Sequence, residues 1–218
     1  MKTVLFAIGL LGLFGWLPPK KRVVFFGDSI TQAAVKPDGY LDVLKKELDK
    51  NGRGGDYEIV GAGISGNKVP DLQARLERDV LSRNPDVVFI YIGINDVWHY
   101  AQPNNSGTPK AKFESGLTDI ISQLKAKNIR VVLCTPSVIG EAAAGTNPQD
   151  KMLDEYAAAS REVAQATGAA LCDLRAAFQR YLGKHNKDNL DKNVLTTDGV
   201  HLNNAGNQLV AREMVAFL

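Results

Sequence analysis

Apolar residues follow two patterns along the chain: short continuous runs, and longer stretches with apolar positions at helical spacing. Five short runs stand out, and most are apolar on both alternations, as expected of strands buried on both faces of a sheet. These predicted strands are Arg22–Phe26, Tyr57–Gly61, Asp86–Gly93, Arg130–Thr135 and Ala169–Asp173. Between them, apolar residues recur every three or four positions, which predicts helices. The predicted helices are Tyr40–Lys50, Pro70–Leu81, Phe113–Lys127, Met152–Thr167 and Ala205–Leu218.

Strands that alternate with helices predict an α/β fold, in which a five-stranded parallel sheet lies between two layers of helices. Three polar or irregular stretches interrupt the pattern: Trp98–Lys112, Ser137–Asp150 and Gly183–Thr197. Ligands of such folds bind beyond the carboxyl ends of the strands, and long loops there are often functional. The residues that follow each strand are therefore the first candidates for a site.

The N-terminal residues do not fit the domain pattern. Lys2 precedes an apolar run from Val4 to Leu17, which is shorter than the roughly 20 residues of a comfortable membrane span. A positive start and a short apolar run resemble a secretory signal peptide, although the cleavage pattern is poor. An uncleaved membrane anchor and a buried N-terminal element stay open as alternatives. We expect a signal peptide or anchor at residues 1–19, one domain at 20–218, and export to the periplasm or the exterior.

Composition excludes several classes of function. The chain has 218 residues, 44% hydrophobic and 23% charged, with a formal net charge of +2. This charge is too small to indicate a nucleic-acid partner, and a membrane partner is expected only if the N-terminal segment is uncleaved. Cys134 and Cys172 each follow an apolar run, which favours two buried free thiols over a bridge or a reactive thiol.

A serine and a histidine near opposite ends of the domain are candidates for nucleophilic catalysis. Ser29 lies in Gly-Asp-Ser-Ile, immediately after the first predicted strand. A serine hydroxyl becomes a strong nucleophile only when a base removes its proton. His201 is the candidate base, and Asp198, three residues earlier in Asp-Gly-Val-His, is placed to orient its imidazole. A helix cap at Ser29, and a turn before a helix-start histidine, are the alternatives.

The second and third strands end in Gly-Ile-Ser-Gly-Asn and Gly-Ile-Asn-Asp. Acyl transfer needs hydrogen-bond donors placed in advance for a tetrahedral oxyanion. The backbone N–H groups of Ser29 and Gly66 and the side-chain amide of Asn95 are candidates for this role. A glycine turn and an Asx turn are the alternative interpretations of the last two.

The remaining histidines indicate a substrate contact rather than a metal site. His185 lies among lysine, asparagine and aspartate residues, which predicts a solvated loop position. His99 follows the third strand beside Trp98, so both are candidate substrate contacts, as is Asp28 next to the serine. Three scattered histidines without ligand spacing predict no metal, and we expect no cofactor.

The glycine spacing after the second strand also matches a dinucleotide-binding fingerprint, Gly61-x-Gly63-x-x-Gly66. That fingerprint normally occupies the first strand-to-helix turn, and here it occupies the second. A nucleotide site would also leave the serine, asparagine and histidine blocks without a role. We therefore reject this interpretation.

The four ordered blocks GDSI, GISGN, GIND and DGVH resemble the SGNH hydrolase superfamily of GDSL-type esterases and lipases. The resemblance covers Arg22 to Leu218, with Ile30 where the name GDSL has leucine. It implies a flavodoxin-like SGNH hydrolase fold and a serine esterase without a cofactor. It also implies roles for named residues: nucleophile, oxyanion donors, orienting carboxylate and base, which fall on Ser29, Gly66, Asn95, Asp198 and His201.

The resemblance leaves the substrate open, because the family includes carbohydrate acetylesterases, lysophospholipases and thioesterases. The polar Trp98–Lys112 stretch, with its aromatic residues, favours a sugar ester, and export favours polysaccharide over cytosolic thioesters. We expect hydrolysis of short-acyl esters, acetyl above all, on a small molecule or a polysaccharide. A lysophospholipase or other lipid acylhydrolase is the alternative, and a non-catalytic carbohydrate-binding module is the alternative from another class.

Overall fold

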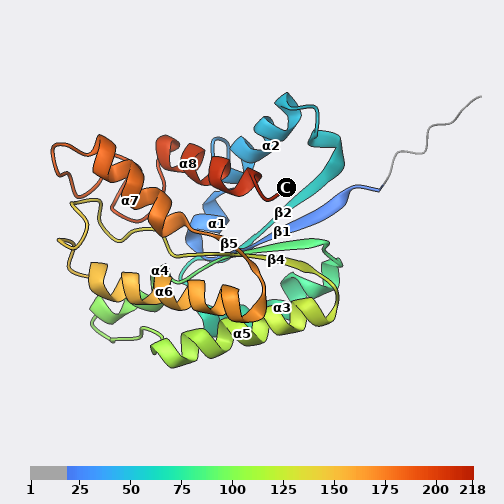
Figure 1. The fold of residues 1–218 in the computed structure, drawn as a ribbon, viewed down its shortest axis with the longest axis horizontal. Helices are drawn as coiled ribbons and strands as arrows, with labels where there is room; N and C mark the ends of the chain where they lie inside the picture. The colour runs from blue at the N-terminus through green and yellow to red at the C-terminus, as the bar shows by residue number, and fades with distance from the viewer. Residues whose placement is uncertain (1–18) are drawn as a thin grey trace, which may run out of the picture.

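The computed structural model describes residues 19–218, which form one parallel sheet between two layers of helices (Figure 1). The strands are β1 (Lys21–Gly27), β2 (Tyr57–Gly63), β3 (Val87–Tyr91), β4 (Arg130–Cys134) and β5 (Ala170–Cys172). Their order is β2-β1-β3-β4-β5 and all pairings are parallel. This confirms the predicted α/β class and its flavodoxin-like order. The predicted signal peptide or anchor lies, except for Pro19, outside the described residues.

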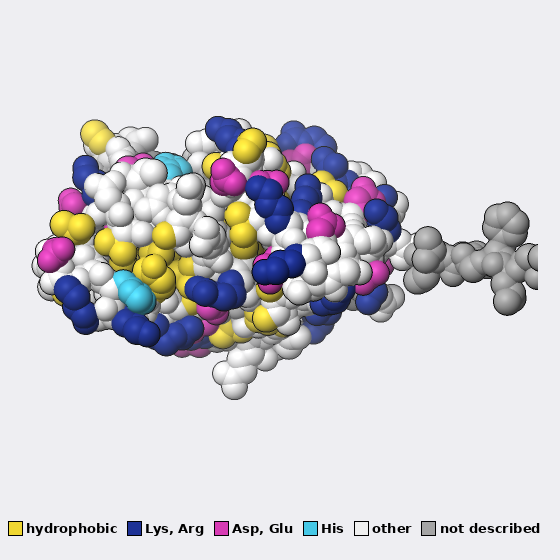
Figure 2. All heavy atoms as spheres, turned by 90° about the horizontal axis from the view of Figure 1, so that it is seen from above, with side chains coloured by type: hydrophobic (Ala, Val, Ile, Leu, Met, Phe, Trp, Pro, Cys, Tyr) yellow, Lys and Arg dark blue, Asp and Glu magenta, His cyan; other side chains and the backbone are white. Residues whose placement is uncertain are grey.

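Helices cover both faces of the sheet. They are α1 (Ser29–Ala33), α2 (Tyr40–Lys50), α3 (Val69–Asp79), α4 (Ile94–Trp98), α5 (Lys110–Ala126), α6 (Asp150–Thr167), α7 (Leu174–His185) and α8 (Asn204–Val215). In Figure 1, α1, α2, α7 and α8 lie on one face, and α3, α5 and α6 lie on the other. Figure 2 looks onto the first of these layers, where acidic and basic side chains are interspersed around small hydrophobic areas. Within residues 19–218, no helix combines the length and the apolar character that crossing a bilayer requires.

The core lies on both sides of the two central strands. Phe25 of β1 and Phe89 of β3 are at most 1% exposed, and their rings stack with centroids 4.5 Å apart. Val24 and Val88 are neighbours in the parallel register and are fully buried. These strands are apolar on both alternations because a helical layer covers each face.

The strand order places the site. β1 and β3 are neighbours, and their connections leave toward opposite faces, which creates a crevice at the carboxyl end of the sheet. Ser29 follows β1 and Asn95 follows β3, so both lie at this crevice. Gly27 and Gly63 are register partners at the same edge. A Cβ on Gly63 would come closer than 3.0 Å to backbone atoms of residues 28, 31 and 32, so a glycine is needed for α1 to start here.

Some predicted boundaries are wrong. The sequence pattern predicts an irregular stretch from Gly183, but residues 174–185 form α7. Asp173 starts this helix, because its side chain accepts the N–H of Ala176, and Leu174 and Phe178 supply the buried face. The stretch predicted as a loop after Trp98 contains a 3₁₀ turn at His99–Ala101 and the first turn of α5.

The close approach at the sheet edge leads to a stability prediction. We expect Gly63→Ala to lower the free energy of unfolding by about 1–3 kcal/mol, because its Cβ meets backbone that cannot rotate away. Gly183→Ala is the matched control: no atom lies within 4 Å of its Cβ, and α7 gains about 0.5–1 kcal/mol from the better helix former. Urea denaturation of both variants measures this, and equal effects would contradict the steric argument.

Candidate active site

Ser29 occupies the first position of α1, just past the end of β1. Asp28 caps the helix, because its Oδ1 accepts the N–H of Ile30 at 3.0 Å. The Ser29 side chain is only partly buried, so its hydroxyl is accessible from the crevice. The cap and the close packing of Gly27 against Tyr91 and Thr31 together fix the position of the Ser29 backbone.

A histidine and a carboxylate complete the contact with Ser29. His201 Nε2 lies 3.0 Å from Ser29 Oγ, and His201 Nδ1 lies 2.7 Å from Asp198 Oδ2. Asp198 Oδ1 also accepts the N–H groups of Val200 at 3.0 Å and His201 at 2.7 Å. Partial burial opposes ionisation of Asp198, but these hydrogen bonds outweigh it and lower the pKa of the carboxyl. An ionised Asp198 favours a proton on Nδ1, which leaves Nε2 free to accept one from the serine.

The loop that carries Asp198 and His201, just before α8, is held together by hydrogen bonds between its own residues. The N–H of Thr197 donates to the carbonyl of His201 at 2.8 Å, and Thr196 forms an antiparallel bridge with Leu202. Asp198 and His201 therefore lie on a tight turn whose two arms are bonded to each other. This explains how two residues of a loop keep a fixed orientation.

The predicted oxyanion donors gather at the same edge of the sheet. Gly66 has φ +77°, and Asn95 is 4% exposed at the start of α4. Asn95 Nδ2 donates to the carbonyl of Asn67 at 3.1 Å, which uses one of its two hydrogens. Within residues 19–218, the backbone N–H groups of Ser29 and Gly66 donate to no other residue. These donors are thus free for a ligand at the carboxyl ends of β1 and β2.

Arg75 of α3 connects the end of β1 to the end of β2. The sequence pattern did not predict it as a site residue. It is 5% exposed, and its guanidinium donates to the carbonyls of Gly27 at 2.7 Å and Ala62 at 3.0 Å. It also donates to Asn67 Oδ1 at 2.7 Å and pairs with Asp79 at 3.0 Å. Its position on the apolar face of a predicted helix was the available signal, because a charge there needs buried partners.

Two buried carboxyl groups are sequence neighbours of the candidate site residues: Asp28 precedes Ser29, and Asp96 follows Asn95. Asp28 is 2% exposed, and burial raises its pKa to about 7, opposed by the hydrogen bond from Ile30. Asp96 is fully buried and accepts the N–H of Val69 at 3.1 Å. Burial raises the pKa of Asp96 to about 6. Asp28, a candidate substrate contact by sequence, is enclosed beneath the serine in this structure.

The aromatic residues after β3 lie beside the imidazole. The rings of Trp98 and His201 meet edge to face, with centroids 6.4 Å apart. His99 lines an open hollow with Gln102, Pro103, Asn104 and Ser106. Partial burial and the nearby Lys68 lower the pKa of His99, which favours the neutral ring at neutral pH. Trp98 is therefore adjacent to His201, and His99 faces an open hollow with mostly polar residues around it.

The other candidate groups are apart from this crevice. His185 is exposed at the end of α7, against the ring of Tyr181, rather than in the predicted loop. Cys134 and Cys172 are buried, unbridged register partners on β4 and β5, as the sequence favours. Residues 19–218 contain no group of three or more His, Cys, Asp or Glu side chains arranged to hold a metal ion.

Comparison with known proteins identifies the family. The model of the GDSL-like Lipase/Acylhydrolase family matches residues 25–209. The chain belongs to this family. Membership confirms the resemblance drawn from the four blocks, and makes the chain a carboxylic ester hydrolase. Membership of this enzyme family argues against the alternative that the chain is a non-catalytic carbohydrate-binding module.

Individual relatives of this GDSL-like hydrolase are esterases that act on acetyl esters by name. The Acetylxylan esterase of Geobacillus stearothermophilus is 31% identical over 210 residues, which cover 88% of this chain and 91% of that protein. A solved acetyl xylan esterase is 45% identical, with a TM-score of 0.88 over 90% of this chain and 99% of that chain. The Isoamyl acetate-hydrolyzing esterase 1 homolog of Rattus norvegicus is 28% identical over 87% of this chain and 78% of that protein.

Solved variants of the Geobacillus stearothermophilus enzyme bear on the chemistry. Two are described as catalytic mutants, one with a serine and one with a histidine replaced by alanine. The serine variant is 28% identical to this GDSL-like chain, with a TM-score of 0.79 over 90% of this chain and 93% of that one. The residue types replaced in these two variants, serine and histidine, are those that meet in the crevice here.

The buried carboxyl beside the serine leads to a pH prediction. Because the pKa of Asp28 is raised from 3.8 to about 7, the folded state keeps a proton that the unfolded state releases. Its contribution to stability is present at low pH and is lost as pH rises toward 7. Asp28→Asn mimics the protonated form, so we expect its advantage over wild type to grow by up to about 1.4 kcal/mol per pH unit between pH 4 and 7.

Urea denaturation of both proteins from pH 4 to pH 8 tests this expectation. Asp188→Asn, at an exposed carboxylate, is the control and should keep a constant difference from wild type. A constant difference for Asp28→Asn as well would show that Asp28 is ionised throughout this range.

Proposed function

We propose that this chain is a serine esterase that removes acetyl groups from carbohydrate, with acetylated xylan-type chains as the substrate class. One observation carries the proposal: Ser29 Oγ lies 3.0 Å from His201 Nε2, and His201 lies 2.7 Å from Asp198. The similarity to two acetylxylan esterases, at 31% and 45% identity, supports the choice of substrate.

In the proposed acylation step, Ser29 Oγ attacks the acetyl carbonyl while His201 Nε2 takes the hydroxyl proton. Asp198 stabilises the imidazolium that forms. The oxyanion receives hydrogen bonds from the N–H groups of Ser29 and Gly66 and from the Asn95 amide. Each such donor is worth about 10²–10³ in rate. His201 then gives its proton to the sugar oxygen, and the sugar leaves with a free hydroxyl.

In the proposed deacylation step, water takes the place of the sugar. His201 removes a proton from this water, which attacks the acetyl group on Ser29. The second oxyanion rests on the same donors, and the returning proton restores the serine hydroxyl as acetate leaves. The groups present supply each proton and each charge, so we expect no cofactor.

The shape of the site supports a carbohydrate ester over a lipid. The side chains of His201 and Asp198 are 38% and 48% exposed, so the reacting groups lie at a shallow surface that a polymer can reach. The hollow beside His99 is lined by Pro103 and by the polar side chains of His99, Gln102, Asn104 and Ser106, which suit sugar hydroxyls. Large exposed hydrophobic residues within 19–218 are limited to Val35, Ile64 and Leu190. A long acyl chain would require a larger apolar surface.

We also propose that the protein is exported, and that residues 1–19 act as a signal peptide or as an anchor. The support is the positive start and the short apolar run in the sequence. Export would bring the enzyme to extracellular polysaccharide, in agreement with the proposed substrate. A nucleic-acid partner is not expected, because the net charge is only +2.

A chain-length series tests the esterase mechanism. We expect hydrolysis of p-nitrophenyl esters to peak at acetate among acetate to octanoate, and acetate to be released from acetylated xylooligosaccharides. Ser29→Ala should lower kcat by on the order of 10⁴-fold or more while its far-UV circular dichroism is unchanged. Full activity of Ser29→Ala would disprove the mechanism. A peak at octanoate would favour the lipid acylhydrolase instead.

A second experiment tests the polar hollow as the sugar site. We expect His99→Ala to raise KM for acetylated xylooligosaccharides about 3–10-fold at nearly constant kcat, as loss of one hydrogen bond of about 1 kcal/mol implies. KM for p-nitrophenyl acetate should not change, because this substrate has no sugar to contact His99. A fall in kcat at unchanged KM on both substrates would place His99 in the chemical step.

A further inference from the structure

Residues 139–149, in the loop between β4 and α6, bind the loop that carries Asp198 and His201. The N–H of Gly140 donates to the carbonyl of Gly199 at 2.8 Å, next to Asp198. The N–H of Glu141 donates to the carbonyl of Asp191 at 2.9 Å. Two backbone hydrogen bonds therefore join loops that lie about 50 residues apart in sequence, with α6, β5 and α7 between them.

The Glu141 side chain makes a third and stronger connection. It is 1% exposed, and its Oε2 accepts the N–H of Val194 at 2.7 Å. Its Oε1 accepts the N–H groups of Leu195 at 2.6 Å and Thr196 at 2.5 Å. Among residues 19–218, no Lys, Arg or His pairs with this carboxylate, so three consecutive amide dipoles hold its charge.

The segment that Glu141 holds is bonded directly to the catalytic turn. Thr196 Oγ1 accepts the N–H of Gly199 at 3.0 Å, and the carbonyl of Leu195 accepts the N–H of Asn203 at 3.0 Å. The first contact reaches the residue that follows Asp198, and the second reaches the residue two positions after His201. A shift of residues 194–196 would therefore move the carboxylate and the imidazole relative to Ser29.

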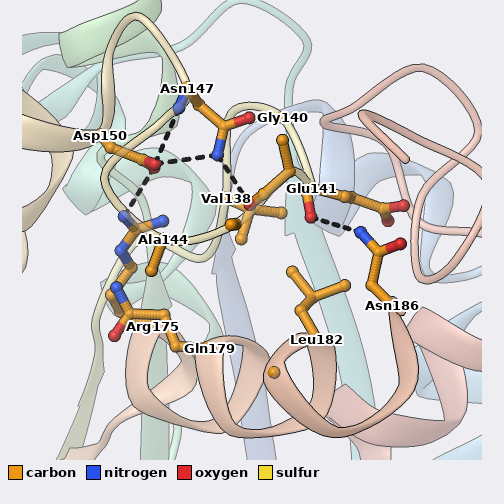
Figure 3. Close-up of a pocket in the computed structure, with 13 residues that line it drawn as sticks. Val138, Gly140, Glu141, Ala144, Asn147, Asp150, Arg175, Gln179, Leu182 and Asn186 are labelled. Atoms are coloured by element: carbon orange, nitrogen blue, oxygen red, sulfur yellow. Dashed lines mark hydrogen bonds and ion pairs between the residues drawn. The ribbon is translucent and has the colours of Figure 1, made fainter. Parts of the chain in front are cut away.

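Figure 3 shows how the same loop is supported on its other side. The Glu141 carboxylate points away from the cavity of about 200 Å³ that the loop forms with α7. On the cavity side, Asp150 Oδ1 lies 2.8 Å from Arg175 Nη2, and Asp150 Oδ2 accepts from Asn147 Nδ2 at 2.8 Å. Asp150 is 1% exposed, so the chain holds two buried carboxylates close in sequence, and only Glu141 contacts the catalytic loop.

We propose that Glu141 is a positioning residue for the hydrolysis reaction, which orders the loop that aims Asp198 and His201 at Ser29. This inference rests on the proposed function of that triad. Glutamine has nearly the same shape, but its NH₂ group would face an N–H donor and lose at least one of the three bonds. A misplacement of about 1 Å at a catalytic group can cost on the order of 10²-fold in rate.

The experiment compares Glu141→Gln with Asp150→Asn, the matched change at the other buried carboxylate. We expect Glu141→Gln to lower kcat on p-nitrophenyl acetate about 10–100-fold, with KM within about 3-fold of wild type. Phosphonylation of Ser29 by a small organophosphonate should slow in parallel, because it also needs an aligned base. Asp150→Asn should lower the Tm but keep kcat and the phosphonylation rate near wild type.

Glu141→Asp gives a second test if the glutamine variant does not fold. It keeps the charge but is one methylene shorter, so we expect a smaller loss of kcat in the same direction. Wild-type kcat in a folded Glu141 variant, or equal kcat losses in Glu141→Gln and Asp150→Asn, would overturn the positioning role. Failure of the triad itself is distinguishable, because Ser29→Ala would then retain activity.

Discussion

The contact between Ser29 Oγ and His201 Nε2, at 3.0 Å, joins segments that lie 172 residues apart. The proposed reaction depends on this distance, and the fold maintains it from both ends. β1 and the Asp28 cap place the serine at the switch point of the sheet, where α1 begins. The turn before α8 brings the imidazole back to the same edge from the far end of the chain. A parallel sheet permits this, because all its strands end at one edge.

Buried charged side chains hold the parts of the site that are not in regular structure. Arg75 bonds to the carbonyls of Gly27 and Ala62 and to Asn67, and so joins the ends of β1 and β2. Glu141 bonds to three successive N–H groups of the histidine loop. Burying a charge is costly, and removal of one partner leaves the other unsatisfied. Each of these groups therefore allows one loop conformation and penalises the alternatives.

The sequence predicted the fold, and it placed the candidate site residues at the strand ends, for a physical reason. Fully buried strands and amphipathic helices leave periodic signals, and residues that follow parallel strands must gather at one edge. Arg75 and Glu141 left weaker signals, because their partners are backbone atoms of distant segments. α7 was missed after a strand of only three residues, Ala170–Cys172, where the period gave no clear boundary. Loop-to-loop contacts depend on tertiary structure, which local pattern does not encode.

The ionisable groups near the site differ in solvent exposure, and this difference agrees with the roles proposed for them. The side chains of Asp198 and His201 are 48% and 38% exposed, so in the proposed mechanism the sugar oxygen and the attacking water can both reach the imidazole. Glu141 and Arg75 are 1% and 5% exposed; the Glu141 carboxylate accepts three backbone N–H groups, and Arg75 donates to two backbone carbonyls and to two side chains. A charge bonded to backbone fixes where a loop lies but does not need to exchange protons. In the proposed cycle His201 can therefore gain and lose a proton beside an ionised Asp198, while the buried charges keep the geometry constant.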